Sequence, residues 1–177
     1  MDVVPCGTSL AGFRDADPAR LREVVATLAE GTDVILLDSA AALGSRAAVL
    51  PVVLADRVVV VLQPTIPSLS DALKVQEYAA TYDTGVAGLV FNRVTPDEDI
   101  DAIARKAERY FDGKTLATVP ESEVARAARR AGEPLLAHAP ESEASEAYRH
   151  AADALDVQSN PSGVVADRFR SAVIPRK

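Results

Sequence analysis

The stretch Asp33-Val-Ile-Leu-Leu-Asp-Ser-Ala-Ala-Ala-Leu-Gly44 decides the fold class of this chain. Four apolar residues, Val34 to Leu37, follow one another without a polar interruption, which is typical of a strand buried on both faces of a parallel sheet. The run ends on Asp38, so this carboxylate is expected at the carboxyl end of a strand, where open α/β sheets bind their ligands. Two interpretations of Asp38 stay open: a carboxylate on the Mg²⁺ side of a nucleotide site, or a cap or turn residue.

Apolar runs of the same kind recur on both sides of this stretch and alternate with helical patterns. We expect strands at 2–5, 33–38, 57–62, 85–91 and 114–119, and helices at 18–30, 45–55, 70–82, 97–110, 122–131 and 142–155. Pro51 is expected to interrupt or kink its helix, Ser68 or Ser70 to cap the next one, and Gly7 to Gly12 to form a turn. The alternation predicts βαβ units, and therefore a three-layer αβα domain with a mostly parallel sheet.

Composition limits the class of protein. The chain has 177 residues, of which 48% are hydrophobic, so it is long and apolar enough for one globular domain. Its net charge of -7 argues against non-specific nucleic-acid binding by the whole chain. The single cysteine, Cys6, cannot form an internal disulfide, which favours a reducing, cytoplasmic compartment. We expect a domain over 1–156, a linker over 157–163 and a separate tail over 164–177.

Several ordered segments resemble the MinD/ParA group of P-loop ATPases, and its MinD branch most closely. Residues 4–12 resemble its "lPaGpsl" segment, 33–44 its "DyvliDsPAGlg", 63–72 its "tPeipSlsDAlk", 90–93 its "vvNR" and 119–134 its "iPedpaVreAxxxGxPv". The match runs from Val3 to about Leu155. The resemblance implies an ATP-binding switch protein of the kind that places the division site or partitions DNA, with ATP and Mg²⁺ as ligands.

Two departures from the family set this chain apart. The family's phosphate-binding loop, of the form KGGxGKT, has no counterpart in the sequence. The glycine of the family's "DsPAG" switch is replaced by Ala42, whose methyl group resists a positive φ. We therefore expect a P-loop NTPase-like sheet without its phosphate-loop strand, in either a fragment of a longer protein or a truncated paralogue.

The resemblance also assigns candidate site residues. Asn92 matches the asparagine that hydrogen-bonds adenine, and Pro120 and Glu121 match the loop beside the base and ribose. Asp38 matches the carboxylate on the Mg²⁺ side, in a switch degenerate at Ala42, and would hold the metal only weakly and only with nucleotide. Without the resemblance, the favoured explanation of Asn92 is a strand end, and that of Pro120-Glu121 is a helix start.

These inferences lead to two functional hypotheses. The first is the C-terminal portion of a MinD/ParA-like ATP-binding switch, without ATPase activity as it stands because transition-state stabilisation is missing. The second is a degenerate, non-enzymatic interaction module derived from that family.

Partner expectations concern the sheet edge and the tail. An unpaired strand edge would favour a homodimer or other self-association. The tail over 164–177 resembles a weak amphipathic membrane helix, which would place the protein peripherally at the inner face of the cell membrane.

Overall fold

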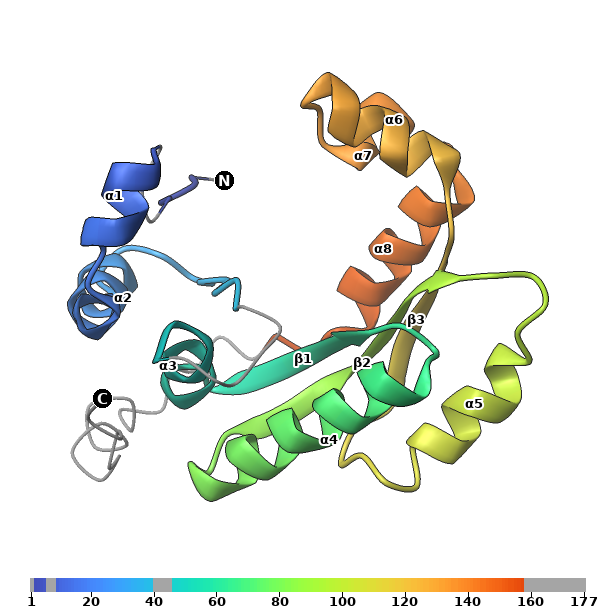
Figure 1. The fold of residues 1–177 in the computed structure, drawn as a ribbon, viewed down its shortest axis with the longest axis horizontal. Coiled ribbons are helices and arrows are strands. Elements are labelled where there is room, and N and C mark those ends of the chain that lie inside the picture. Colours follow the sequence, from blue (N-terminus) through green and yellow to red (C-terminus); the bar gives the residue numbers. More distant parts are fainter. Residues whose placement is uncertain (1, 6–8, 40–45, 158–177) are drawn as a thin grey trace.

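The computed structural model describes residues 2–5, 9–39 and 46–157. Its sheet has three strands, β1 (Arg57–Leu62), β2 (Gly85–Val94) and β3 (Thr115–Pro120), in the order β1-β2-β3. Both pairings are parallel. Helices α4 (Ile66–Thr81) and α5 (Ile100–Ala107) cover one face of the sheet, and α8 (Glu143–Ala154) covers the other (Figure 1). The expected three-layer αβα fold with a parallel sheet is confirmed.

The central strand β2 explains why its sequence is apolar without alternation. Leu89, Val90 and Phe91 are consecutive and all buried, so this strand contributes to the core on both faces. On the side of α4 and α5 the core cluster contains Val60, Leu62, Ala72, Leu89, Phe91, Ala107 and Phe111. On the side of α8 it contains Val90, Leu116, Val119 and Ala144.

Polar side chains fix where the helices begin. Thr65 caps α4, rather than Ser68 or Ser70 as expected, and its hydroxyl accepts a hydrogen bond from the Ser68 N–H at 3.4 Å. Ser122 caps α6 (Glu123–Ala131), and Ser142 caps α8 in the same way. A short helix that the sequence did not predict, α7 (Leu135–His138), lies between α6 and α8.

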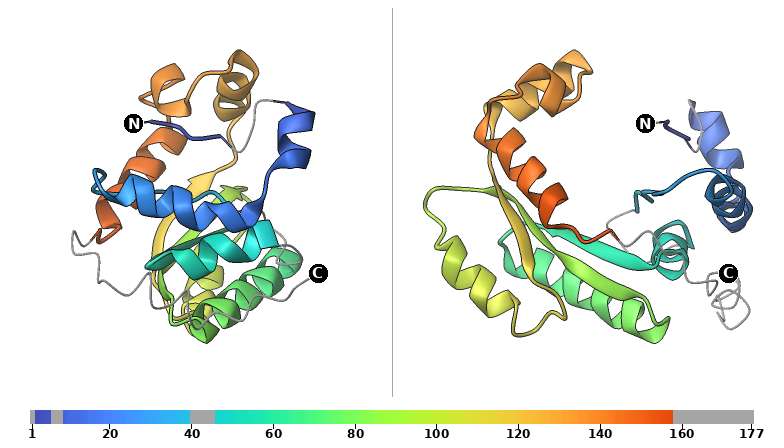
Figure 2. Two further views of the ribbon diagram at one scale, coloured as in Figure 1. Left: turned by 90° about the vertical axis from the view of Figure 1, so that its left-hand side faces the viewer. Right: turned by 180° about the vertical axis from the view of Figure 1, so that it is seen from behind.

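The N-terminal part of the chain is helical and lies apart from the sheet (Figure 2). It consists of α1 (Leu10–Asp15), the 3₁₀ turn η1 (Pro18–Arg20) and α2 (Leu21–Ala29), and α3 (Arg46–Leu54) follows. The turn expected at 7–12 is wrong at its described end, because Ser9 caps α1 by accepting from the Gly12 N–H. The interruption expected at Pro51 is also wrong: α3 is continuous, and Pro51 still accepts a hydrogen bond from the Ala55 N–H.

Two expected strands are absent. Residues 2–5 and 33–38 form no ladder with any strand in the described part of the chain. Val34 and Leu36, expected to be buried, are 47% and 78% exposed. An apolar run becomes a strand only where a neighbouring backbone accepts its hydrogen bonds, and none of the three strands lies beside this segment.

Over the described ranges, no helix combines the length and the hydropathy needed to cross a bilayer. Most of the expected linker and all of the tail over 164–177 lie outside the residues that the structure describes.

Candidate functional site

The carboxyl ends of the three parallel strands lie at the same end of the sheet. Three of the candidate residues, Asn92, Pro120 and Glu121, lie together at this end. Asn92 is the register partner of Val119, and Val94 is that of Pro120. The Glu121 N–H donates to the Val94 carbonyl at 2.8 Å, which extends the pairing by one residue. Asn92, Pro120 and Glu121 are therefore held by the backbone at the end of a parallel sheet, where α/β folds bind ligands.

Asn92 is half-buried near the end of β2. Of its side-chain amide, only the oxygen makes a hydrogen bond with another described residue. Its Oδ1 accepts a hydrogen bond from the Arg93 N–H at 2.9 Å. Its Nδ2 has no hydrogen-bond partner among the described residues. A side-chain amide carries two N–H donors, so Asn92 can still donate to an acceptor atom on the edge of a bound base.

The backbone at Arg93 is unusual. Its φ is 59°, in the left-handed region that L-residues with a side chain seldom adopt. With this backbone conformation the Arg93 guanidinium reaches Glu121 at the end of β3. The Asn92 side chain lies at the carboxyl end of the sheet. Backbone strain of this kind is concentrated at functional sites.

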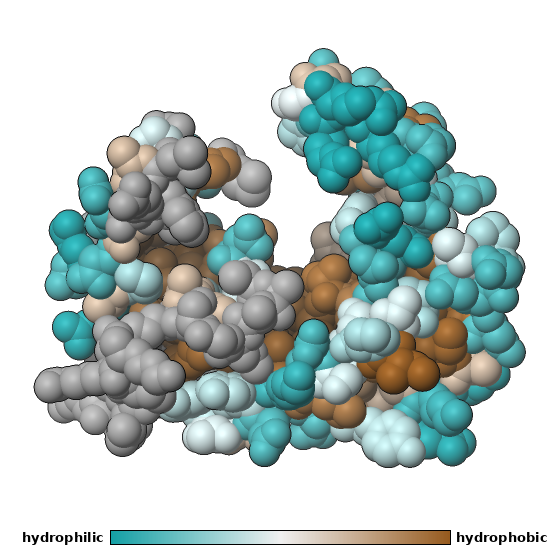
Figure 3. Space-filling model, in the orientation of Figure 1, coloured by the Kyte–Doolittle hydropathy of each residue, from teal (hydrophilic) through white to brown (hydrophobic). Residues whose placement is uncertain are grey.

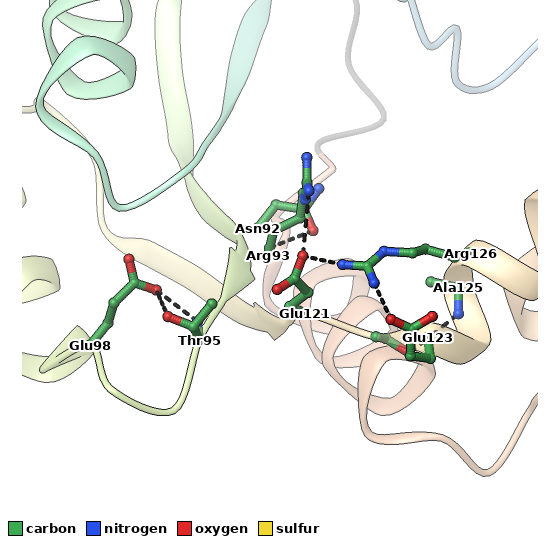
Figure 4. A network of polar contacts seen from close by, with 9 residues as sticks. Asn92, Arg93, Thr95, Glu98, Glu121, Glu123, Ala125 and Arg126 are labelled. Atoms are coloured by element: carbon green, nitrogen blue, oxygen red, sulfur yellow. Dashed lines mark hydrogen bonds and ion pairs between the residues drawn. The ribbon is translucent and has the colours of Figure 1, made fainter.

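Glu121 is the centre of an ion network that links the ends of β2 and β3 to α6 (Figure 4). Its Oε1 lies 3.3 Å from Nη2 of Arg93 and also pairs closely with Arg126, which in turn pairs with Glu123. The hydrogen bonds from Arg93 and then Arg126, followed by the Arg126 charge, hold the pKa of Glu121 below its ordinary value. The carboxylate therefore stays ionised, and its position is fixed from two sides.

The loop that follows β2 is fixed as well. Thr95 donates to Oε2 of Glu98 twice, from its N–H at 2.7 Å and from its hydroxyl at 3.0 Å (Figure 4). These bonds shape the connection to α5 and determine the path of the chain after Asn92. No motif or spacing in the sequence indicates this pair.

Asp38 stands apart from this group. It is exposed, in the non-helical segment that follows α2, and it makes no hydrogen bond or ion pair with another described residue. Ala42 lies outside the described residues. In the described ranges no group of three or more His, Cys, Asp or Glu side chains could hold a metal ion. The structure thus brings together Asn92, Pro120 and Glu121, the candidates for contact with the base and ribose. A role for Asp38 in binding Mg²⁺ stays a prediction.

Arg93 and Arg126 are the residues of this site that sequence reasoning missed. Arg93 adjoins Asn92, but its contact with Glu121 depends on the β2–β3 register. Arg126 follows Glu123 by one helical turn, a spacing at which opposite charges pair. That spacing was the only available signal.

Comparison with known proteins places this chain in a family. A family model described as 4Fe-4S iron sulfur cluster binding proteins, NifH/frxC family, matches residues 11–173. Two relatives from Methanocaldococcus jannaschii are named uncharacterized ATP-binding proteins: MJ0547, 31% identical over 76% of this chain, and MJ0169, 33% identical over 71%. The chain spans about half the length of each, 50% and 47%.

Solved structures agree with these matches. The cell division ATPase MinD of Pyrococcus furiosus superimposes with a TM-score of 0.74 at 28% identity, over 84% of this chain and 62% of that one. MinD of Pyrococcus horikoshii, solved with Mg-ADP, gives 0.73 at 29% identity, over 85% and 61%. The resemblance to the MinD/ParA ATPases is confirmed.

The iron–sulfur chemistry in the family's description does not fit this chain's own residues. A 4Fe–4S cluster is held by four cysteine thiolates. The sequence contains one cysteine, Cys6. One cysteine cannot by itself supply these four ligands.

Proposed function

The chain belongs to the NifH/frxC family, with MinD/ParA ATPases as its structural neighbours, and we propose that it forms the base-binding portion of an ATP-dependent switch protein. The observation that carries this proposal is the group formed by Asn92, Pro120 and Glu121 at the carboxyl edge of the sheet. ATP-binding relatives at 31% and 33% identity support it.

The proposed role of each residue follows from its chemistry. The Asn92 amide donates to a ring nitrogen of adenine from Nδ2, while its Oδ1 is anchored on the Arg93 N–H. Pro120 presents a flat apolar surface beside the base. Glu121 accepts from the ribose hydroxyls, in an orientation held by Arg93 and Arg126.

Asp38 is proposed to act on the Mg²⁺ side of the nucleotide. A bound Mg²⁺ would neutralise charge on the phosphates. We expect the chain by itself to show no ATP turnover, because its sequence contains no KGGxGKT loop to stabilise the transferring phosphoryl group. Turnover above a control without protein would contradict this expectation.

A second candidate function is a non-enzymatic interaction module. It is favoured by Ala42 in place of the switch glycine and by apolar side chains on the outer surface of α4. There Leu73 is 41% exposed and Tyr78 is 38% exposed. In this interpretation α4 contacts a partner protein and the nucleotide plays no part.

A thermal melt with and without Mg-ATP separates the two candidates. A ligand that binds only the folded state raises the midpoint by mass action, by the equivalent of about 2.7 kcal/mol at one hundred times Kd. We expect a rise with Mg-ATP and Mg-ADP that is lost in Asn92→Ala. The control is Asn160→Ala, which changes the chain's other asparagine and should keep the rise. No shift in the unmodified chain would favour the interaction module.

Division-site placement or DNA partitioning is the process that we propose, by analogy with the MinD and ParA proteins. Homodimerisation is part of the same proposal. Peripheral membrane contact through 164–177 is a further proposal, tested by co-sedimenting liposomes with the chain and with a variant that lacks 160–177. Equal pelleting of both would contradict it.

A further inference from the structure

The orientation of the Asn92 amide determines which edge of a base it can bind. A backbone N–H only donates, so the amide atom that faces the Arg93 N–H at 2.9 Å must be the oxygen, Oδ1. Figure 4 shows this oxygen turned back toward the chain at Arg93. The Nδ2 group, with its two N–H donors, is therefore the part of the amide that is left for a ligand.

A β-bulge at Arg93 fixes this orientation. The register shifts between Asn92 and Val94, which pair with consecutive residues of β3, so Arg93 is an extra residue in β2. Its φ of 59° accompanies the bulge. In a bulge the extra residue is left out of the ladder, and the Arg93 N–H bonds instead to the Asn92 side chain. The oxygen of Asn92 is thus held by the main chain and is turned away from a ligand.

The charged side chains beside Asn92 add further donors. The guanidinium of Arg93 has five N–H donors and no acceptor, and it lies 3.3 Å from Oε1 of Glu121. Arg126 of α6 pairs with the same Oε1, and Figure 3 shows a mostly hydrophilic surface over α6 and α7. The other oxygen of Glu121, Oε2, is the one that the proposed function leaves for the ribose. The side chains around the Asn92 amide therefore offer a base mainly donors.

Adenine and guanine differ at the edge that such donors meet. Both bases carry the acceptor N7, but at the neighbouring position adenine has an amino group, a donor, and guanine has the oxygen O6, an acceptor. An asparagine selects adenine when its nitrogen donates to N7 and its oxygen accepts from the amino group. The oxygen of Asn92 is engaged by the Arg93 N–H, whereas the two N–H donors of Nδ2 match N7 and O6.

We propose that Asn92 makes this a purine site that does not select adenine, and that guanosine diphosphate (GDP) binds at least as tightly as adenosine diphosphate (ADP). This inference rests on the proposed function, because it concerns the same nucleotide site. With adenine, Nδ2 bonds to N7 and meets a second donor at the amino group. With guanine, both positions of the edge accept, so no donor faces another donor.

The test is isothermal titration calorimetry of the full chain in Mg²⁺ with ADP, GDP, inosine diphosphate and cytidine diphosphate. The base of inosine diphosphate has N7 and O6 like guanine but lacks the 2-amino group, so this nucleotide isolates the edge that Asn92 faces. We expect the dissociation constants of GDP and inosine diphosphate to be equal to or below that of ADP. Cytidine diphosphate, which has no N7, should bind about tenfold more weakly.

Asn92→Asp makes the test specific to the amide donors. One carboxylate oxygen can still accept from the Arg93 N–H, and the other now faces the base as an acceptor. The preference for GDP over ADP should therefore shift toward ADP by about tenfold or more, whereas Asn92→Ala should weaken both alike. The matched control is Asp153→Asn, the reverse exchange at an exposed position of α8, which should leave both dissociation constants unchanged. Circular dichroism melts establish that the variants are folded.

Four results would overturn the inference. Binding of ADP without GDP would overturn it and leave the proposed function standing, as would an unchanged preference in Asn92→Asp. Binding of GDP without inosine diphosphate would mean that another residue reads the 2-amino group of guanine. Binding of none of the nucleotides would remove the proposed function itself, and this inference with it.

Discussion

The carboxylate of Glu121 at the end of β3 lies 3.3 Å from the guanidinium of Arg93 at the end of β2. This pair joins two strands whose carboxyl ends form the proposed base site, and Arg126 completes it from α6. Because both side chains are partly exposed to solvent, the pair contributes little to the free energy of unfolding, and its main effect is to orient the Glu121 carboxylate.

The first prediction concerns the titration of Glu121. Its pKa is lowered by hydrogen bonds from Arg93 and then Arg126, so Arg93→Ala and Arg126→Ala should each raise it toward the ordinary 4.5. Because the folded pKa is depressed, any stabilisation by this group is present above the unfolded pKa and is lost as the pH falls through the folded pKa. Carboxyl ¹³C NMR across acidic pH measures the shift.

Glu108 is the internal control for this titration. Its pKa is lowered mainly by the hydrogen bond from the Thr115 N–H, a residue remote from the two arginines in the sequence. It should titrate identically in all three proteins. An unchanged Glu121 pKa in both variants would show that the network is absent in solution.

The second prediction isolates the backbone strain at Arg93. Its positive φ disfavours any side chain with a Cβ, so Arg93→Gly should be more stable than Arg93→Ala by about 1 kcal/mol. Both variants lose the ion pair, and their difference therefore reports the backbone alone. Urea unfolding gives the two free energies.

The matched control for Arg93 is Arg105, an exposed residue inside α5. There glycine should be less stable than alanine by about 1 kcal/mol, the opposite sign, because the position is helical. The same sign at both positions would contradict the left-handed assignment at Arg93.

Much of the fold follows from local patterns. The runs at 57–62, 85–91 and 114–119 are strands because each lies beside another strand, and the helices expected over 122–131 and 142–155 begin there, capped by Ser122 and Ser142. The run at 33–38 does not form a strand for a non-local reason: it has four consecutive apolar residues, as β1 has five, but no described strand pairs with it. The sequence alone cannot show whether a neighbour is present.

The site was only partly predictable. Asn92, Pro120 and Glu121 were identified through the family resemblance, and the parallel register brings them to one edge. Arg93 and Arg126 were missed because their contacts depend on tertiary geometry that joins β2, β3 and α6. Charge spacing along one helix suggested the pair Glu123–Arg126, but not the link to Glu121.

The third prediction concerns close packing between β2 and β3 at Gly88. A Cβ on this residue would lie 2.5 Å from Cγ of Leu116 and 2.8 Å from the Lys114 carbonyl oxygen. Gly88→Ala must therefore push the two strands apart, at a cost of about 1–3 kcal/mol. Urea unfolding measures it, and Gly31→Ala, which meets nothing within 4 Å, is the control. Equal stabilities of the two variants would contradict this packing.

The fourth prediction concerns the start of α8, the helix that covers the face of the sheet at β3. The hydroxyl of Ser142 accepts from the Ser145 N–H at 3.3 Å and donates to the Ala139 carbonyl at 2.9 Å. Ser142→Ala removes these contacts, together with the one between the Ser142 and Ser145 hydroxyls at 3.0 Å, and should lower the free energy of unfolding by about 1 kcal/mol.

The control for the α8 cap is Ser70→Ala, at an exposed position inside α4. Alanine favours a helix interior over serine, so this variant should be neutral or slightly more stable. Because α8 is the helix that packs on β3, the loss in Ser142→Ala should appear as faster hydrogen exchange in α8 before it appears elsewhere. Uniformly faster exchange across the sheet and all helices would mean that the cap stabilises the whole domain and not one helix.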